Sequence, residues 1–292
     1  MIANRGFLPD GFDRRLTPAR PDLAAESLQG IVAAQLYVAP RRMRVRSEVV
    51  ALRAEPHPEA GMDTQALFGE RIDIYEIDIE GWAWGQLARD RYVGYMAADD
   101  LTNDVAEAEA THRILAPRTF IYPARNIKSP PISALPMNAL VHVMDDDGTF
   151  ARLREGFVPQ RHLALLDVTT SDFVSVAERF LHAPYLWGGK TWLGLDCSGL
   201  IQIALQAAGV EAPRDTDMQA AQLGAPLAID DLSRLQRGDL VFWKGHVGVM
   251  RDAQTLLHAN GYFMQVTSEP LQEARARIAA SSSGDVTAVR RF

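Results

Sequence analysis

The hydrophobic pattern of this 292-residue chain changes character at Thr170, and that change limits the folds open to it. Before Thr170, short β-like runs at residues 45–52, 71–79 and 82–87 alternate with glycine turns. Short strands at such spacing indicate small all-β barrels. After Thr170, two helical patterns precede a series of strand-like runs, which is typical of an α+β domain. The pattern therefore predicts all-β units followed by an α+β domain.

The all-β part is predicted to hold two weak copies of one small barrel. In the second copy, the turn Asp145-Asp146-Asp147-Gly148 separates the runs 140–144 and 150–153, which is a strong hairpin signal. In the first copy, Gly81 divides a comparable pair of runs. We therefore divide the chain into four parts: a lead-in with at most one short helix (1–30), a first barrel (31–103), a second barrel (104–168) and an α+β domain (169–292).

Hydrophobic spacing places two helices at the start of the α+β domain. In residues 171–181, apolar side chains recur on one face behind a Ser171 or Asp172 cap. In residues 196–208 they recur at the i, i+3, i+4 and i+7 positions, and Gly209 supplies the stop. Strand-like runs follow at residues 239–243, 246–250, 255–259 and 286–290.

Composition excludes several classes of function. The net charge of −7, from 30 basic and 37 acidic residues, is unlike that of a nucleic-acid-binding protein. One cysteine allows neither an internal disulfide nor a thiolate zinc cluster, and no metal or cofactor is expected. The first residues lack the apolar core of a secretory signal, and no run is long enough to span a membrane. We expect a cytoplasmic protein, in which a lone thiol stays reduced.

The position of the single thiol indicates a nucleophile. Cys197 follows Asp196, a favoured N-cap residue, and so occupies the first turn of the second helix. There the helix macrodipole and exposed N–H groups favour an anion, which predicts a lowered thiol pKa. Ser198 and Gly199 leave room for a substrate backbone, and free N–H groups at a helix start can hold an oxyanion. The plain alternative is an inert buried cysteine.

Two histidines are placed to assist that thiol. His246 begins one strand-like run, and His258 lies in the next run after the turn at residues 251–254. Antiparallel pairing of these runs would bring the two rings side by side. His246 is then the candidate base and His258 the group that orients it, with Asn260 as the competitor for the orienting role.

These residues resemble the NlpC-type cell-wall cysteine peptidases, which have a papain-like fold. The resemblance covers about residues 170–265 and rests on motifs in the family's order: Pro184-Tyr185-Leu186-Trp187-Gly188-Gly189, Asp196-Cys197-Ser198-Gly199-Leu200-Ile201, Arg237-Gly238-Asp239-Leu240-Val241-Phe242-Trp243, His246-Val247-Gly248-Val249 and His258-Ala259. It implies an α+β papain-like catalytic domain preceded by two small all-β SH3-like barrels.

The barrels before the peptidase resemble a narrower branch, the γ-D-glutamyl-L-diamino acid endopeptidases with amino-terminal bacterial SH3-like domains. The branch implies cleavage between D-Glu and the diamino acid of a murein tripeptide or tetrapeptide with a free amino-terminal L-Ala. Such an enzyme recycles wall peptides in the cytoplasm. The first barrel is expected to gate the groove by blocking longer chains.

The same resemblance implies a set of substrate-binding residues. In the peptidase domain they are Tyr185, Asp196, Ser198, Arg214 and Asp215, although Thr216 stands where the branch often has serine. Glu70 and Tyr92 of the first barrel match the acidic residue and tyrosine that the branch contributes to the pocket. The charges suit the ligand, since an ammonium needs carboxylates and a D-Glu carboxylate needs a cation such as Arg.

Other functions stay open at this stage. An acyltransferase or amidase on the same fold would differ in the acceptor, an amine in place of water. A wall-peptide-binding module with a relic catalytic domain is a third possibility, against which the intact Cys197, His246 and His258 argue. The barrels could also anchor the enzyme to the polymeric wall.

Overall fold

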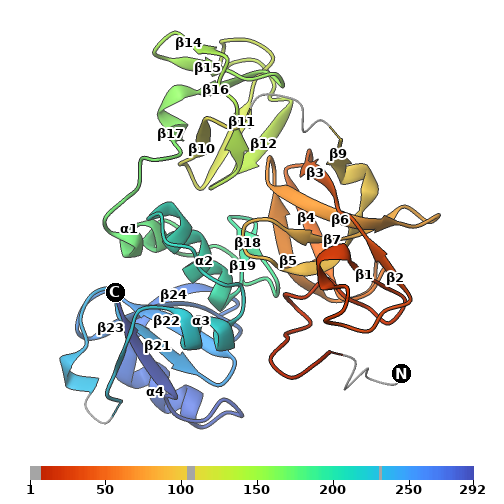
Figure 1. Ribbon diagram of the computed structural model, residues 1–292. Helices are drawn as coiled ribbons and strands as arrows, with labels where there is room; N and C mark the ends of the chain where they lie inside the picture. The colour runs from red at the N-terminus through yellow and green to blue at the C-terminus, as the bar shows by residue number, and fades with distance from the viewer. Residues whose placement is uncertain (1–7, 104–108, 230–231) are drawn as a thin grey trace. The chain divides into compact units, whose positions relative to one another are not determined.

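The computed structural model describes residues 8–103, 109–229 and 232–292, and these residues form two compact units (Figure 1). The first unit takes the chain as far as Ala110 and also includes Ala139–His142. The second unit consists of Thr111–Asn138 and Val143–Phe292.

Among the described residues of the first unit, seven strands form one antiparallel sheet with the order β5-β4-β8-β7-β6-β3-β9. Alternate side chains point inward, so that Leu52, Ile72 and Met96 lie in its core. The strands are β3 (Arg41–Val45), β4 (Val49–Arg53), β5 (Met62–Leu67), β6 (Arg71–Ile77), β7 (Trp82–Leu87), β8 (Val93–Ala97) and β9 (Leu101–Thr102), with a 3-10 turn at Ala98–Asp100.

The predicted strand over residues 45–52 is wrong in one respect, because it is two strands. β3 pairs with β6 and β9, whereas β4 pairs with β5 and β8. The residues between them leave the ladder, and Arg46 donates its backbone N–H to the Asp100 carbonyl oxygen at 2.9 Å. A continuous apolar run does not reveal that its two ends pair with different partners.

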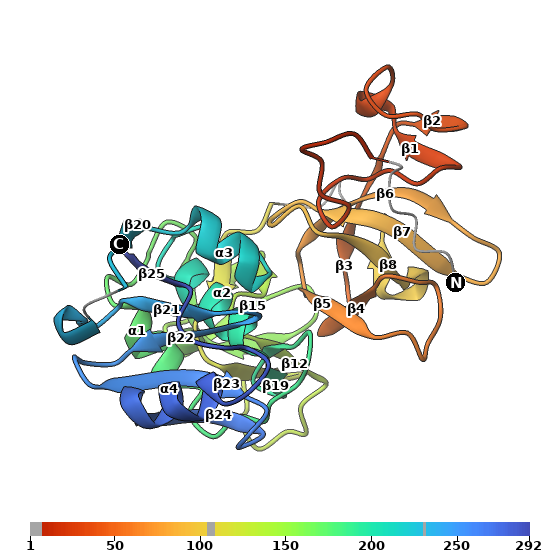
Figure 2. The same cartoon turned by 90° about the horizontal axis from the view of Figure 1, so that it is seen from below.

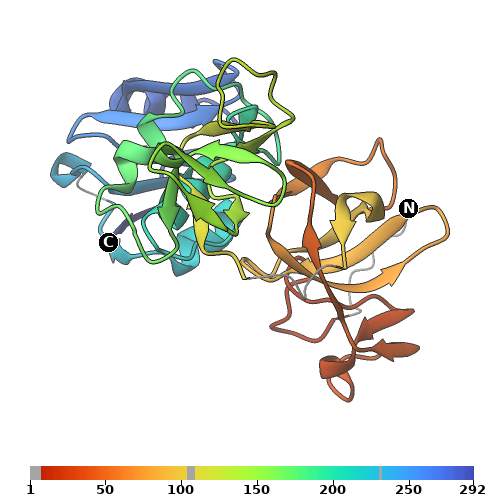
Figure 3. The ribbon, with the colours of Figure 1, turned by 90° about the horizontal axis from the view of Figure 1, so that it is seen from above.

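The lead-in packs against this sheet. β1 (Leu23–Ala25) pairs in parallel with β2 (Leu36–Val38), and these short red strands lie beside the orange sheet in Figure 3. The Arg20 guanidinium lies 4.5 Å from the centroid of the Trp84 ring and donates to the Glu76 carboxylate at 2.6 Å. The expected short helix is a 3-10 turn at Glu26–Leu28, and residues 1–7 of the lead-in lie outside the described residues.

Residues 111–138 and 143–168, here called the middle segment, form small separate ladders. β11 pairs with β12, β14 with β15 and β16, and β10 with β17. The predicted hairpin is present as β14 and β15, but its turn follows Asp146, two residues later than the first of the predicted turn residues. A second closed barrel stays a prediction. The elements are β10 (His112–Ile114), β11 (Arg118–Ile121), β12 (Ser133–Pro136), β14 (Asp145–Asp146), β15 (Phe150–Arg152), β16 (Phe157–Pro159), β17 (Leu163–Leu165) and a 3-10 turn at Gln160–His162, while β13 (Leu140–Val141) belongs to the first unit.

The rest of the second unit is an α+β fold built on a sheet that has six described strands in the antiparallel order β20-β25-β21-β22-β23-β24. Helices α2 and α4 lie on opposite sides of this sheet (Figures 1 and 2). The strands are β20 (Ala225–Leu227), β21 (Leu240–Trp243), β22 (His246–Met250), β23 (Thr255–Asn260), β24 (Gln265–Pro270) and β25 (Ala288–Arg291). The other elements are α1 (Phe173–Glu178), α2 (Cys197–Ala207), α3 (Thr216–Gln222), α4 (Leu271–Ala279), the hairpin β18 (Lys190–Thr191) with β19 (Gly194–Leu195), and a 3-10 turn at Leu232–Arg234.

Local signals place the first two helices correctly, but the first is shorter than predicted. Asp172 caps α1, as expected, by accepting the Val174 N–H at 3.1 Å. Beyond Glu178 the helical pattern gives way to turns, because Arg179, Phe180 and Leu181 donate their N–H groups to the third residue before each of them. His182 then adopts a left-handed backbone with φ of 69°. The sequence pattern predicts neither α4 nor β24. Leu271 and Ala274 of α4 are buried and Ile278 is partly buried against the same core, so the apolar stripe of this helix is narrow and its other faces are polar.

The middle segment braces the carboxyl end of α2. The buried Arg113 guanidinium donates to the carbonyl oxygen of Ala207 at 2.9 Å and to that of Val168 at 2.8 Å. Asn138 donates to the Ile203 carbonyl oxygen at 2.9 Å. The last carbonyls of a helix have no partners within it and carry partial negative charge, so a cation and an amide stabilise them. The middle segment is thus joined to the helix whose other end carries Cys197.

We predict that Arg113→Ala lowers the free energy of unfolding by about 2–4 kcal/mol, because it leaves buried carbonyls without their charged donor. Hydrogen exchange of the α2 amides should accelerate, and thermal unfolding should shift to lower temperature. The matched control is Arg125→Ala, which removes a more exposed pair with Asp145 and should cost about 0–1 kcal/mol. Equal effects of the two changes would contradict the bracing role.

Candidate active site

The start of α2 is held by Asp196, which caps the helix and positions the thiol. One carboxylate oxygen accepts the Gly199 N–H at 2.7 Å, and the other accepts the Gly188 N–H at 2.8 Å. A side chain at position 199 would collide with the Gly189 carbonyl oxygen, so glycine is needed for this close approach. The cap therefore joins the loop at residues 188–189 to the first turn of α2, which contains Cys197.

Arg214 neutralises this cap. Its guanidinium is buried and donates to both Asp196 oxygens, at 3.0 and 2.6 Å, and to the Ser198 hydroxyl oxygen at 2.8 Å. The resemblance implied that Arg214 would meet a substrate carboxylate, but the structure directs it toward a carboxylate of its own chain. Asp215, which is partly exposed, follows as the first residue before α3 and adds negative charge near Arg214.

The thiol of Cys197 is buried, and its protonation differs from the sequence prediction. Burial raises the pKa of Cys197, and the nearby Asp196 carboxylate raises it further. The backbone N–H groups of Val247 and Ser198 and the Arg214 charge act in the opposite direction but do not outweigh them. The predicted lowering rested on the helix macrodipole and the exposed N–H groups, and it left out burial and the charge on the cap.

A line of hydrogen bonds runs across the sheet from the strand beside the thiol. His246 Nε2 lies 2.8 Å from His258 Nδ1, and His258 Nε2 lies 2.7 Å from a Glu269 carboxylate oxygen. Arg277 of α4 donates to Glu269 at 2.7 Å. We call these four residues the histidine line. Val247, next to His246 in β22, is the residue whose N–H acts on the Cys197 thiol.

The two histidines adjoin because β22 and β23 are antiparallel neighbours, as the turn at residues 251–254 predicts. The competing Asn260 lies at the end of β23, where its side-chain oxygen accepts the Phe263 N–H at 2.8 Å. His258, and not Asn260, therefore makes the recorded contact with the His246 ring.

Sequence reasoning missed Glu269 and Arg277. Glu269 lies in β24, opposite Leu256 and diagonal to His258 across the β23–β24 pair. The register of that hairpin would have identified it, but the run at residues 265–270 is too polar to be recognised as a strand. Arg277 lies in a helix whose apolar stripe is too narrow to stand out in the sequence.

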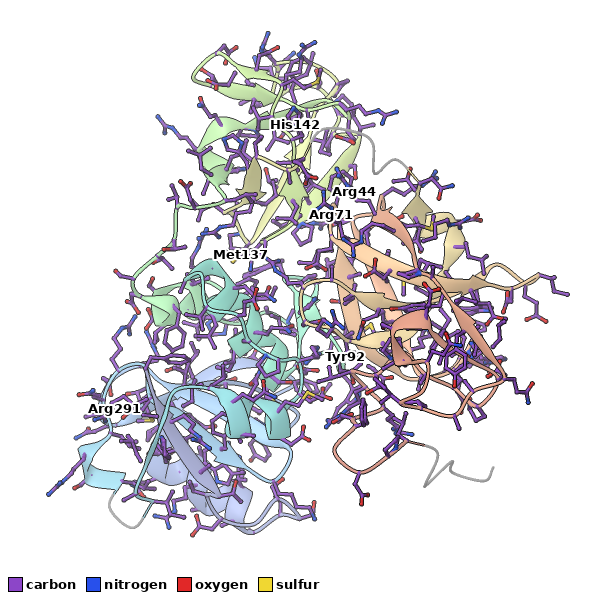
Figure 4. All side chains as sticks on the ribbon, viewed as in Figure 1. Arg44, Arg71, Tyr92, Met137, His142 and Arg291 are labelled. Atoms are coloured by element: carbon purple, nitrogen blue, oxygen red, sulfur yellow. The ribbon has the colours of Figure 1, made fainter. Side chains whose placement is uncertain are left out.

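The other predicted site residues lie in two different places. Tyr185 is partly exposed, and burial raises its pKa, with further contributions from the nearby Cys197 and Asp196 charges. Ser198 donates its hydroxyl to Asp196 at 3.2 Å. Glu70 and Tyr92 belong to the first unit, where Tyr92 is labelled in Figure 4. Glu70 is buried there and accepts the Leu67 N–H at 2.9 Å.

A buried thiol at a helix start and a line of ring nitrogens on the adjoining sheet have the composition of a nucleophile, a base and an orienting group. Many acyl-transfer hydrolases use these three groups. Groups of three or more His, Cys, Asp or Glu side chains suited to a metal ion are not found among the described residues. In that part of the chain, no helix is both long and apolar enough to cross a membrane.

Comparison with known families gives the same class. Residues 182–279 match the NlpC/P60 family, and residues 52–101 match the bacterial dipeptidyl-peptidase Sh3 domain. The chain thus combines an NlpC/P60 peptidase domain with a preceding SH3 domain, and the resemblance noted from the sequence motifs is confirmed.

Relatives extend along most of the chain. Dipeptidyl-peptidase 6 of Lysinibacillus sphaericus is 26% identical over 260 residues, which is 82% of this chain and 94% of that protein. A gamma-D-glutamyl-L-lysine dipeptidyl-peptidase of Bacillus subtilis is 29% identical over 223 residues, 68% of this chain and 72% of the relative. A crystal structure of an NlpC/P60 family protein from Bacillus cereus shares the fold, with a TM-score of 0.70 and 17% identity over 86% of this chain and 99% of that one.

We predict that the free enzyme holds Cys197 as a neutral thiol at pH 7, because its pKa is raised to about 12. Alkylation by iodoacetamide should be slow at neutral pH and should still rise between pH 7 and 10, without a plateau at lower pH. The same chain unfolded in urea is the control, since its thiol should titrate near 8.5. A plateau below pH 7 would instead indicate a preformed thiolate.

Proposed function

We propose that the protein is a cysteine peptidase that hydrolyses the γ-D-Glu–diamino acid bond of short murein peptides with a free amino-terminal L-Ala. The observation that carries this proposal is the Cys197 thiol beside the strand that begins with His246, with His258 hydrogen-bonded behind it. The relatives named gamma-D-glutamyl-L-lysine dipeptidyl-peptidases support this choice of bond.

The proposed reaction begins with proton transfer. His246 takes the proton of Cys197 as the sulfur attacks the γ-carbonyl carbon of D-Glu, which forms a tetrahedral oxyanion. Collapse of this intermediate breaks the C–N bond, and His246 returns the proton to the departing amine of the diamino acid. Water, deprotonated by His246, then hydrolyses the thioester and regenerates the thiol.

Tyr185 is the proposed donor to the oxyanion. The Gly199 N–H is already bound by Asp196, so that amide of the first turn is engaged in the cap. The Tyr185 hydroxyl is protonated at neutral pH, as tyrosines ordinarily are, and burial raises its pKa further. Its proximity to Cys197 is evident from their electrostatic interaction. A neutral donor close to the nucleophile stabilises charge that develops in the transition state.

The proposed substrate recognition uses the charged side chains close to the thiol. Since Arg214 is bound to Asp196, we propose that it acts by holding that cap in place, whereas the partly exposed Asp215 contributes to binding the substrate ammonium. Glu70 and Tyr92 stay predictions as gating residues of the first SH3-like barrel. A cytoplasmic role in murein recycling is part of the same proposal.

We predict that Cys197→Ala abolishes hydrolysis of L-Ala-γ-D-Glu-L-Lys and of its diaminopimelate counterpart, while circular dichroism and thermal unfolding stay close to those of the unaltered protein. Loss of the nucleophile removes the covalent route, so the rate should fall by at least about 10⁴-fold. Mass spectrometry of the products distinguishes hydrolysis from transfer when an amine is added. Retained turnover in the variant would sink the assignment.

We also predict that acetylating the L-Ala amine of the same tripeptide lowers kcat/KM by about 30- to 1000-fold. The carboxylate that pairs with the ammonium would be left unpaired, which costs about 2–4 kcal/mol. Blocking the carboxyl end of the peptide as an amide is the control for a general effect of modification. Equal turnover of the free and acetylated peptides would favour longer wall chains as substrates.

A further inference from the structure

Glu269 determines which atom donates in each hydrogen bond of the histidine line. Glu269 is held ionised: burial raises its pKa, but hydrogen bonds from His258 and Arg277 outweigh this and bring it to about 2. An ionised carboxylate accepts hydrogen bonds and donates none. His258 must therefore carry its proton on Nε2, which faces Glu269 at 2.7 Å.

The proton positions then follow one after another. A neutral His258 with a proton on Nε2 has a lone pair on Nδ1, so it accepts from His246 Nε2 across the 2.8 Å contact. His246 must then be protonated on Nε2. Its remaining nitrogen, Nδ1, carries the free lone pair that a base requires.

We propose that Glu269, clamped by Arg277, is a positioning residue that fixes His258 and His246 as their Nε2–H tautomers and so makes Nδ1 of His246 the base for Cys197. The inference rests on the proposed cysteine-peptidase function. Glu269 does not contact the thiol or the scissile bond in this scheme and acts through the two rings.

The clamp is built from elements that pack on one another. Arg277 extends from α4 to Glu269 in β24, and its guanidinium also lies 4.6 Å from the Tyr262 ring centroid and 5.2 Å from that of Phe263. Those two rings form the tip of the β23–β24 hairpin. Arg277 therefore ties the helix, the edge strand and the hairpin tip together, which leaves the Glu269 carboxylate little freedom to rotate.

The same hairpin tip adjoins the nucleophile's surroundings. Tyr185 donates its backbone N–H to the Met264 carbonyl oxygen at 2.9 Å, and nearby Val266 donates its N–H to the Ala183 carbonyl oxygen at 2.8 Å. The hairpin that carries Glu269 of the clamp thus also binds the segment that contains Tyr185.

The carboxylate has a second effect, on charge. When His246 accepts the thiol proton, it becomes a cation in a half-buried site flanked by the Trp243 ring. The titratable and charged groups that face this ring are His258, Arg277 and Glu269; Glu269 favours the protonated form of His246, and the other two oppose it. A glutamate therefore supplies both an acceptor and a compensating negative charge, whereas a glutamine would supply the acceptor alone.

The test compares Glu269→Ala with Glu269→Gln on the L-Ala-γ-D-Glu-L-Lys substrate. We expect the alanine variant to lose about 100- to 1000-fold in kcat with little change in KM, because the base is then divided between two tautomers. The glutamine variant keeps an oxygen for His258 and should recover part of that loss. Arg275→Met is the matched control for the clamp variant Arg277→Met, since Arg275 lies on the same helix and pairs with the exposed Asp285.

A readout that does not depend on turnover is the histidine tautomer, measured by long-range nitrogen–proton NMR on the isotope-labelled full chain. We expect both rings as Nε2–H forms in the unaltered protein and a tautomer mixture for His246 in Glu269→Ala. A doubly protonated His258 beside a His246 protonated on Nδ1 would overturn the proposal, as would an unchanged kcat in Glu269→Ala.

If Glu269→Ala does not fold, Arg277→Met tests the clamp with the carboxylate in place. An unchanged kcat with unchanged tautomers in that variant would again overturn the proposal.

The experiment distinguishes failure of the proposed peptidase function from failure of the proposed role of Glu269. An unaltered protein that leaves the tripeptide intact contradicts the proposed function, whereas the tautomer measurement reports on Glu269 in either case.

Discussion

The buried ion pair between Asp196 and Arg214 is the constraint on which the rest of the second unit depends. A buried carboxylate is stable only when its oxygens are satisfied, and Asp196 accepts from the Gly188 and Gly199 amides as well as from Arg214. These bonds fix where α2 begins, and hence where Cys197 lies. Arg214 consequently helps to hold the start of α2, and its predicted contact with a substrate carboxylate stays a prediction.

Helix α2 is restrained along its whole length by three kinds of contact. The Asp196–Arg214 pair holds its start, the sheet packs beside it through β22 and β23, and Arg113 binds the carbonyls at its end. On the other side of the sheet, α4 holds the histidine line through Arg277. The thiol and its proposed base are thus positioned by two helices that share one sheet. A neutral thiol suits this arrangement, since the proton can move to His246 when a substrate is bound.

Much of the fold could be predicted because its signals are local. The bounds of β22 follow from the run at residues 246–250, and α2 follows from its cap, its apolar spacing and Gly209. The prediction failed where pairing or burial decides the outcome. The run at residues 45–52 divides because its ends pair with different strands. Helix α4 was not predicted because its core-facing stripe is limited to Leu271, Ala274 and Ile278.

The sequence by itself determined the candidates for chemistry: one thiol directly after an N-cap residue, and histidines at the spacing of an antiparallel pair. Each of these depends on neighbours within a few residues or on one short turn. Only the tertiary structure decided the partner of Arg214, the presence of Glu269 and Arg277 behind His258, and the upward direction of the Cys197 pKa shift. The physical reason is that desolvation and ion pairing depend on which segments meet in space, and those segments lie many residues apart in the chain.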